Sequence, residues 1–322
     1  MDEFSFIDSI KPTYYRQPSL LKGIGDDAAV FRSSKDIVTA VDTFVEDVHF
    51  SRSTMEPYHI GYRALGANIS DLAAMGASPS FYLVSIVIPK NWTQAELSQI
   101  YSGMDDLASK YHMDIIGGDT VSGKKLTISI TVIGYTTTNK ARYRQHAKEG
   151  DIVFVTGTLG DSLAGFHILT SDNENNRYVD QDFYIHRHRK PEPRVTFAQA
   201  LESLGRVSLN DVSDGIANEA SEIADASNVS IVLRENDIPV APSFYQFTYE
   251  QQYQWKLSGG EDFELLGTVA KGDWAVVKEA AEKTNTQLTV IGSVVVKEKH
   301  PVYIEDNAMR KVLKKSGYTH LK

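Results

Sequence analysis

The clearest pattern of hydrophobic and polar positions lies in Gly61–Pro79, GYRALGANISDLAAMGASP. Leu65, Ile69 and Leu72 recur at i, i+4 and i+7, a spacing that places apolar side chains on one face of an α-helix. Pro57 precedes the pattern, and the glycine and proline near its end are typical stop signals. The segment therefore predicts an α-helix that packs one face against a core.

The neighbouring stripe of this helix mixes polar and small apolar side chains: Ala64, Asn68, Asp71 and Met75. The residues four positions before and after Asp71 are Ala67 and Met75, so the helix itself offers no i,i+4 ion pair. A desolvated carboxylate without a counter-charge costs several kcal/mol or takes up a proton. We therefore expect Asp71 to meet either a distant arginine or a bound cation.

Along the rest of the chain, β-rich apolar runs alternate with segments of helical spacing, which is typical of an α/β fold. In the first half the β-rich runs are Asp36–Val41, Phe81–Ile88 and Leu126–Tyr135. A chain of 322 residues is long for one hydrophobic core. We expect two domains, residues 1–137 and 138–322, joined by a polar, basic connection.

Local signals predict further helices and loops. Thr93 and Glu96 form a capping box before an amphipathic helix. Ser213 or Asp214 could cap a helix that starts near residue 216. The basic run His186–Lys190 is expected to be a solvated loop or turn.

The composition excludes several classes of site and partner. The chain has no cysteine, which removes disulfides, thiolate zinc sites, iron–sulfur clusters and cysteine nucleophiles, and suits a cytoplasmic protein. A net charge of −9 would repel nucleic acid. No run approaches the roughly 20 apolar residues of a membrane span, and the acidic start MDEFSFIDSI is unlike a signal peptide. We therefore expect neither a nucleic-acid nor a membrane partner.

Acidic residues recur beside glycine or small residues at expected turns and strand ends. Gly23–Phe31, GIGDDAAVF, presents Asp26 and Asp27 behind two glycines. The stretch formally matches a dinucleotide-binding fingerprint, but a strand-like run follows it where a helix is required, so we reject that interpretation. The other acids of this kind are Asp42, Asp71, Asp119, Asp211, Asp214 and Glu261.

Asp119 is expected to stand at a strand end, directly behind two glycines. The segment from Gly118 to Lys124 imitates a P-loop. Lys125 occupies the position where serine or threonine must bind Mg²⁺, and no helix is expected to follow, so the P-loop interpretation fails.

The mutual repulsion of so many carboxylates requires cations. Without cysteine and with few well-placed histidines, hard divalent ions are expected. Mg²⁺ typically binds one or two carboxylates together with substrate phosphates, which makes a nucleotide phosphate the natural bridging ligand. Arg144 would add positive charge. We therefore expect a site for ATP and Mg²⁺.

The ordered motifs GIGDDAAV, VDTFVEDVHF, NISDLAAMGASP, IIGGDT, DVSDG and SGGEDFELL resemble those of the thiamine-monophosphate kinases, a family of the aminoimidazole-ribonucleotide-synthetase-like superfamily. The resemblance extends from Gly23 to about Tyr318. It implies ATP-dependent phosphorylation of thiamine monophosphate to thiamine diphosphate, the last step of thiamine diphosphate biosynthesis, by direct in-line transfer with several Mg²⁺ ions. It also implies an N-terminal mixed sheet with helices on one face, which pairs in a homodimer, and a C-terminal α/β domain that completes the active site.

The matching motif positions imply roles for particular residues. The metal ligands are expected to be Asp27, Asp42, Asp71, Asp119, Asp211 and Asp214. The ATP contacts are expected to be Gly118, Asp119, Arg144, Ser213 and, on a looser local motif, Tyr111. The thiamine phosphate contacts are expected to be His49, Glu261 and Tyr318. No dedicated general base is expected, because a phosphate with a second pKa of about 6 is already ionised near neutral pH.

Two positions depart from the family pattern. The family often has threonine before the aspartate that matches Asp42 and glycine two residues before His49, whereas this chain has Val41 and Asp47. The change to valine removes a side-chain metal contact at position 41, although the backbone carbonyl could still serve. Asp47 adds a negative charge beside the expected substrate site.

The alternatives within the superfamily are aminoimidazole-ribonucleotide synthetase, selenophosphate synthetase and the hydrogenase-maturation proteins. Selenophosphate synthetase and the hydrogenase-maturation proteins normally need cysteine or selenocysteine, which this chain lacks. The motifs SDLAAMGA and GGEDFELL disfavour aminoimidazole-ribonucleotide synthetase. From another class, a non-catalytic sensor of divalent metal or nucleotide could have kept the same fold.

Overall fold

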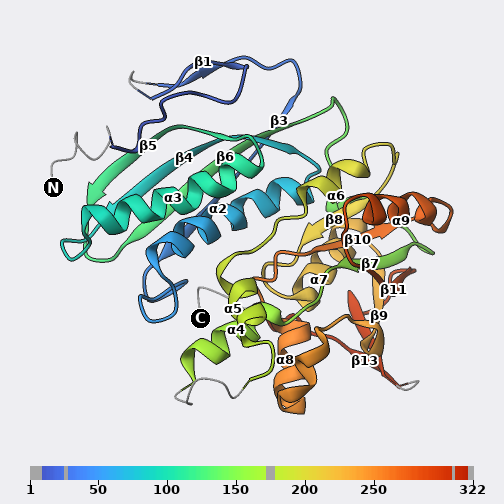
Figure 1. Cartoon of the computed structure of the whole chain (residues 1–322). Coiled ribbons are helices and arrows are strands. Elements are labelled where there is room, and N and C mark those ends of the chain that lie inside the picture. Colours follow the sequence, from blue (N-terminus) through green and yellow to red (C-terminus); the bar gives the residue numbers. More distant parts are fainter. Residues whose placement is uncertain (1–8, 25–27, 172–177, 307–308, 318–322) are drawn as a thin grey trace. The chain divides into compact units, whose positions relative to one another are not determined.

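The computed structural model describes residues 9–24, 28–171, 178–306 and 309–317. The chain forms two compact units (Figure 1). Unit 1 comprises Met1–Leu72 and Ala77–Ala141, and unit 2 comprises Ala73–Gly76 and Arg142–Lys322. None of the described helices combines the length and apolar character that a membrane crossing requires.

Unit 1 is built on a four-stranded mixed sheet in the order β3-β6-β4-β5. β4 and β5 are parallel, and the other neighbours are antiparallel. The helices α2 and α3 lie on one face of the sheet (Figure 1), and a separate two-stranded sheet is formed by β1 and β2. The element bounds are β1 Leu20–Lys22, β2 Val30–Phe31, β3 Asp36–Val45, α2 Pro57–Ala74, β4 Ser78–Ile88, α3 Gln94–Lys110, β5 Asp114–Ser122 and β6 Thr127–Thr136.

The two faces of this sheet differ in burial. Along β6, Ile128 and Ile130 are completely buried, whereas the intervening Ser129 is only half-buried on the opposite face. Side chains alternate between the faces of a strand, so Ile37 and Val41 of β3 lie on the face away from the helices. Their exposed fractions are 53% and 60%. The helix-free face is therefore partly apolar and open to solvent in the described part of unit 1.

Unit 2 contains a seven-stranded sheet in the order β13-β12-β9-β11-β7-β10-β8. β12 is parallel to β9, and the remaining pairs are antiparallel. β8 and β13 are the opposite edges of this sheet. The strand bounds are β7 Ile152–Thr156, β8 Ser208–Asp211, β9 Ser230–Arg234, β10 Leu265–Val269, β11 Leu288–Val295, β12 Val302–Asp306 and β13 Met309–Val312.

Two hydrophobic cores cover the two faces of the larger sheet. The helices α6 and α9 contribute to one core, and α7 and α8 contribute to the other. A third cluster, rich in aromatic residues, joins α4, α5 and α8 through Ala164, Tyr184 and Trp255. The bounds are η1 Arg144–His146, α4 Asp161–Thr170, α5 Gln181–Arg189, α6 Val195–Ala200, α7 Ile216–Ser227, η2 Glu235–Asp237, η3 Pro242–Gln246, α8 Tyr249–Ser258, η4 Lys271–Asp273 and α9 Trp274–Lys283.

The strongest local predictions are confirmed. Leu65, Ile69 and Leu72 of α2 are completely buried. Both halves of the capping box between Thr93 and Glu96 are present at the start of α3. The P-loop interpretation is excluded as expected, because the segment that imitates it continues along β5 without a following helix.

Three local expectations are wrong. His186–Arg189 of the basic run belong to helix α5, where the half-buried Arg187 binds the carboxylate of Glu264 at 2.8 Å. Neither Ser213 nor Asp214 caps α7, whose N-cap is Gly215 without a side-chain hydrogen bond. Asp119 lies inside β5 and not at its end, since the two preceding glycines still pair with β4, directly after a shift in the strand register.

Candidate functional site

Asp42 and Asp71 of unit 1 are brought close together by the packing of α2 on the sheet. The amide of Asn68, which is completely buried, accepts a hydrogen bond from the Asp42 backbone N–H at 2.9 Å and donates one to the Ala64 carbonyl. Asp71 follows Asn68 by three residues, so the two side chains are neighbours on the helix surface. The aspartate of β3 therefore lies within about one helical turn of the aspartate of α2.

Gly118 and Asp119 lie on the other edge strand of the same sheet. The strand register forms one row from Asp42 through Ile130 and Val84 to Gly118. Three interstrand steps separate the ends of this row, which corresponds to about 14 Å. Asp119 is exposed, and its carboxylate accepts the backbone N–H of Thr120 at 3.0 Å.

A Cβ atom at Gly118 would lie 2.0 Å from the Val84 carbonyl oxygen. No side chain fits there, because a backbone atom of the neighbouring strand cannot move aside. Glycine at this position therefore lets β5 stay paired with β4 while it carries Asp119.

His49 is fixed by the chain that leaves β3. Its Nδ1 accepts the Val45 backbone N–H at 3.1 Å, and its ring packs on Phe44 at 5.3 Å between centroids. Of the two acids before it, Asp47 is exposed and forms an ion pair with Lys125. Glu46 is buried and accepts the Leu126 backbone N–H at 3.1 Å. The charge of Asp47 is thus partly neutralised by a lysine. Glu46 instead stabilises the chain after β3 by its hydrogen bond to the Leu126 backbone.

Of three other expected site residues, the structure describes one. Tyr111 is the half-buried C-cap residue of α3, and its backbone N–H donates to the Ala108 carbonyl at 3.2 Å. Asp27 and Tyr318 lie outside the described residues.

In unit 2, the loop after β8 pairs with the loop that precedes β10. The backbone N–H of Glu261 donates to the Ser213 carbonyl at 2.7 Å, and that of Phe263 donates to the Val212 carbonyl at 3.0 Å. A Cβ atom at Gly260 would lie 2.4 Å from the Ser213 oxygen, so the two backbones touch where the sequence has glycine. The expected ATP contact Ser213 and the expected substrate contact Glu261 are therefore neighbours.

The second of these loops has a strained backbone around a buried carboxylate. Glu261 and Phe263 adopt φ values of 67° and 52°, a left-handed conformation that side chains other than glycine rarely adopt. Asp262 between them is buried and accepts the backbone N–H groups of Gly160 at 2.7 Å and Ser162 at 3.0 Å. These bonds hold the loop against the N-terminus of α4 and offset part of the cost of the strain.

Asp262 belongs to a buried network of charges. Arg187 contacts Glu264 and Asp161, and Arg194 binds both oxygens of Glu264 at 2.6 Å. Two arginines thus face three carboxylates. Burial, together with the nearby Asp161, raises the pKa of Asp262 to about 8, and burial also raises the pKa of Asp161. The network therefore retains a proton near neutral pH.

Glu219 holds the loop that carries Asp211 and Asp214. Its carboxylate accepts the Asp214 backbone N–H at 3.1 Å and a hydrogen bond from the side chain of Asn210, which in turn accepts one from Arg144 Nε at 3.0 Å. Burial, and then the charge of Asp211, raises the pKa of Glu219 to about 8. Three carboxylates thus crowd one end of β8, with Arg144 beside them.

Comparison with known proteins assigns the chain to a family. The family model described as "AIR synthase related protein, N-terminal domain" matches residues 25–136, and the corresponding C-terminal domain matches residues 148–305. The thiamine-monophosphate kinase of Bacillus subtilis (strain 168) is 45% identical over 326 residues, which covers 100% of both chains. The chain belongs to the thiamine-monophosphate kinase family. The Escherichia coli (strain K12) member is 33% identical over 301 residues, 92% of this chain and 91% of its own.

Solved structures of thiamine-monophosphate kinases share the fold. The crystal structure of the enzyme from Stenotrophomonas maltophilia K279a superimposes with a TM-score of 0.84 at 29% identity, covering 96% of this chain and 98% of its own. AaThiL complexed with AMPPCP and TMP gives a TM-score of 0.78 at 29% identity, with 99% and 97% covered. The hydrogenase maturation protein HypE of E. coli, at 21% identity, has the same fold.

The residues present fit Mg²⁺ as this kinase family would need it. The donors are carboxylate and carbonyl oxygens, which hard divalent cations prefer. Among the described residues no group of three or more acids and histidines is close enough to hold a metal by itself. Mg²⁺ usually needs only one or two carboxylates together with substrate phosphates.

Sequence reasoning missed Glu219 and Asn210, and it did not recognise the role of Asp262. Glu219 had a local signal, since it lies three residues after Ile216 and four before Ile223 on the apolar face of α7. A charged residue on such a face requires a partner. Asp262 had no comparable signal, because its partners Gly160 and Ser162 are about a hundred residues away.

Proposed function

We propose that this member of the family transfers the γ-phosphoryl group of ATP directly to the phosphate of thiamine monophosphate, giving thiamine diphosphate and ADP. A phosphate oxygen of thiamine monophosphate forms the new bond to the γ-phosphorus, and the bond from that phosphorus to the bridging oxygen of ADP breaks. Relatives that carry the name thiamine-monophosphate kinase over the full chain support the reaction. So does a neighbour that binds AMPPCP, an ATP analogue, together with TMP.

The observation that carries this proposal is the contact between the loops of Ser213 and Glu261. A backbone hydrogen bond of 2.7 Å joins them, so a nucleotide phosphate held at Ser213 and a substrate held at Glu261 would be neighbours. Transfer of a phosphoryl group depends mainly on positioning and charge stabilisation. A backbone that fixes both loops against each other meets the first requirement.

We propose distinct roles for the acids and the remaining contacts. Carboxylates would hold Mg²⁺, which neutralises phosphate charge during transfer: Asp27, Asp42, Asp71, Asp119, Asp211 and Asp214. The nucleotide would be contacted by Gly118, Asp119, Arg144, Ser213 and Tyr111. Thiamine monophosphate would be contacted by His49, Glu261 and Tyr318, where an acid and an aromatic ring suit its cationic thiazolium. The side chain of Val41 carries no oxygen, so only its backbone carbonyl could join this set.

Two wider features complete the proposal. The exposed Ile37 and Val41 on the helix-free face of the unit 1 sheet support a homodimer in which these faces pack together. The absence of cysteine favours a cytoplasmic location.

An assay of the purified chain with ATP, Mg²⁺ and thiamine monophosphate tests the function. We expect thiamine diphosphate and ADP in equal amounts, loss of product on removal of Mg²⁺ with a chelator, and loss of turnover in Asp71→Asn with unchanged thermal unfolding. If ATP binds but no thiamine diphosphate forms, the chain is a nucleotide sensor on the same fold and the kinase proposal is wrong.

A further inference from the structure

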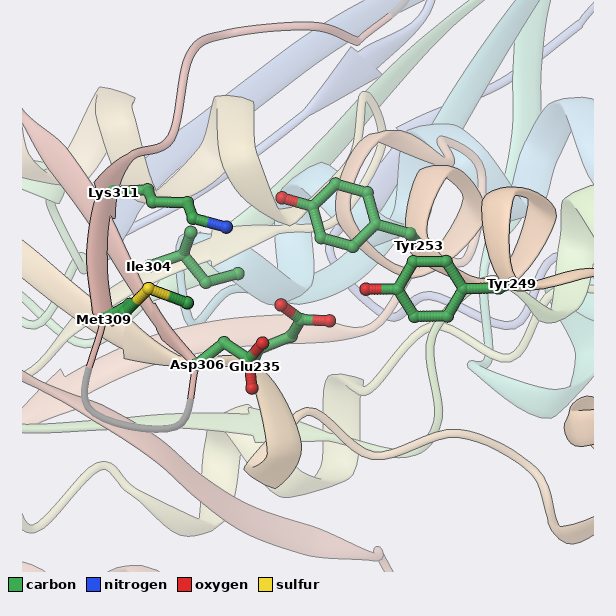
Figure 2. Close-up of a pocket in the computed structure, with 7 residues that line it drawn as sticks. All are labelled: Glu235, Tyr249, Tyr253, Ile304, Asp306, Met309 and Lys311. Carbon is green, nitrogen blue, oxygen red and sulfur yellow. The ribbon is translucent and has the colours of Figure 1, made fainter.

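A small pocket of about 160 Å³ lies at the β13 edge of the unit 2 sheet. Figure 2 shows its walls: Tyr249 and Tyr253 come from α8, Glu235 from η2, and Asp306 and Lys311 from the last two strands. The described residues of unit 2 assigned to phosphoryl transfer lie in or next to β8, or are hydrogen-bonded to residues there, on the opposite edge of the sheet. The pocket therefore shares no residue with the proposed active site.

One wall of the pocket consists of two tyrosine side chains one helical turn apart. Their rings are stacked at 6.3 Å between centroids with an interplanar angle of 29°, and their hydroxyl ends point toward the strand residues (Figure 2). Tyr249 is 74% exposed, although a large aromatic ring on a surface helix gains stability when it is covered. Ile304 and Met309 add apolar surface across from the rings, and a methionine side chain adapts readily to a flat ligand.

The other wall brings two carboxylates into the same space. Glu235 is buried and forms an ion pair with Lys256 at 3.0 Å, and Lys256 does not line the pocket. Asp306 has no ion pair with any described residue. Burial, followed by the charge of Glu235, the neighbouring Tyr249 and the charge of Asp306, raises the pKa of Tyr253. The negative charges of Glu235 and Asp306 thus both reach the Tyr253 hydroxyl. The two phenol oxygens add to the negative potential in the pocket.

Lys311 is the single cation that lines the pocket, and it is exposed on the edge strand β13. It forms no ion pair with Asp306 or Glu235 in the described part of the chain. A long, exposed lysine can turn toward solvent at little cost. A positively charged ligand could therefore take its place beside the acids.

We propose that this pocket is a second ligand site, which binds a small molecule built on a single planar ring with a positive charge. The volume is below the range of about 300–1,000 Å³ that holds drug-sized ligands, so a single ring is the largest flat body that fits. Tyrosine rings and carboxylates both attract cations. A phosphate or a free carboxylate would face two acids and one lysine, and an uncharged ring would leave Asp306 without a partner.

Four small compounds with the same ring skeleton and different charges test the proposal. The probes are 1-methylnicotinamide (cation), nicotinamide (neutral), trigonelline (zwitterion) and nicotinate (anion), titrated into the full chain by calorimetry or ligand-observed NMR. We expect the cation to bind about tenfold more tightly than nicotinamide. Equal affinities for all four, or tightest binding of nicotinate or trigonelline, would overturn the proposal.

Variants locate the binding and separate this site from the kinase site. Asp306→Asn should weaken binding of 1-methylnicotinamide about tenfold without changing that of nicotinamide. Tyr249→Ala should weaken both compounds, and Lys311→Met should tighten the cation because a competing charge is removed. Tyr245→Ala is the matched control, since this tyrosine is 73% exposed and does not line the pocket. Unchanged cation binding in both Asp306→Asn and Tyr249→Ala would place the probe elsewhere and refute the site.

Discussion

At the scale of single residues, Glu219 is the side chain whose loss should be most informative. It is buried and accepts hydrogen bonds from the Asp214 backbone and from Asn210. Removing an acceptor in a buried place leaves its donors unsatisfied, at a cost of about 1–3 kcal/mol. Glu219 contacts the loop of the proposed metal ligands without being one of them, so we infer that it positions Asp214.

We expect Glu219→Ala to lower kcat/KM for ATP by about tenfold to a hundredfold and to raise the Mg²⁺ concentration needed for half-maximal rate. Glu219→Gln, whose single amide oxygen can still accept one of these two bonds, should recover part of the activity. Steady-state kinetics at varied Mg²⁺ makes the measurement. Glu279→Ala is the control, because Glu279 is an exposed acid on α9 whose only ion pair with a described residue is the one to Lys283. An unchanged Mg²⁺ dependence in Glu219→Ala would leave Glu219 with a structural role alone.

The same scale shows which site residues a sequence reveals. Asp71 and Asn68 can be recognised from the sequence, because helical spacing shows two polar side chains in an otherwise apolar stripe. The hydrogen-bond partner of Asn68 cannot be recognised in this way, because it is the backbone N–H of Asp42, which leaves no signal in the sequence. Asp262 looks like one acid among several in its motif, and only the fold reveals that it binds the start of α4.

At the scale of elements, the Gly259–Phe263 loop depends on a close backbone approach. We expect Gly260→Ala to destabilise the chain by about 1–3 kcal/mol, because the new Cβ would meet the Ser213 oxygen at 2.4 Å. The displaced Glu261 should also raise KM for thiamine monophosphate more than KM for ATP. Urea unfolding and steady-state kinetics measure the two effects.

Gly272→Ala provides the control for this substitution, since no atom lies within 4 Å of a Cβ atom built there. Equal stability of the two variants would mean that the loop moves aside without cost.

Helices and strands could be predicted where the sequence signal was local, and the predictions failed where the structure depends on distant residues. The helix α2 and the capping box of α3 follow from periodicity and from one hydrogen-bonding motif. The helix α5 was missed because its arginines look solvated until their buried partners are known. Asp119 was placed at a strand end because paired glycines usually break a strand, whereas here they allow β5 to pass close to β4.

At the scale of the whole molecule, the buried charge network should make stability depend on pH. Asp262 has a pKa of about 8 in the folded chain and about 3.9 when unfolded. The folded state therefore binds the extra proton between these values, and its contribution to stability is lost as the pH rises toward 8. We expect the free energy of unfolding to fall between pH 6 and pH 8, by at most about 1.4 kcal/mol per pH unit from this group, and then to level off.

Denaturant unfolding at several pH values measures this dependence, with Asp262→Asn as the comparison. The variant should be less stable than the parent at pH 6 and should show a smaller fall toward pH 8. A parent profile that stays flat over this interval would show that Asp262 binds no extra proton in the folded chain.

The proposed dimer gives a second prediction at this scale. Val41→Glu places a charge on the open face of the unit 1 sheet, where the valine is 60% exposed, and should convert dimers to monomers in sedimentation experiments. Val296→Glu is the matched control, because Val296 is 57% exposed in unit 2. A parent chain that sediments as a monomer would remove the dimer from the proposal.

The hydrogen bond from the Asp42 backbone to Asn68 has a consequence for how the first sheet is aligned during folding. A strand shifted by one position would present the buried amide with a different residue and would send the aspartate to the solvent side. The misaligned state would also leave a desolvated oxygen without a donor. Asn68 thus favours one register of β3 over its neighbours. We expect Asn68→Leu to give folded molecules in which β3 occupies more than one register.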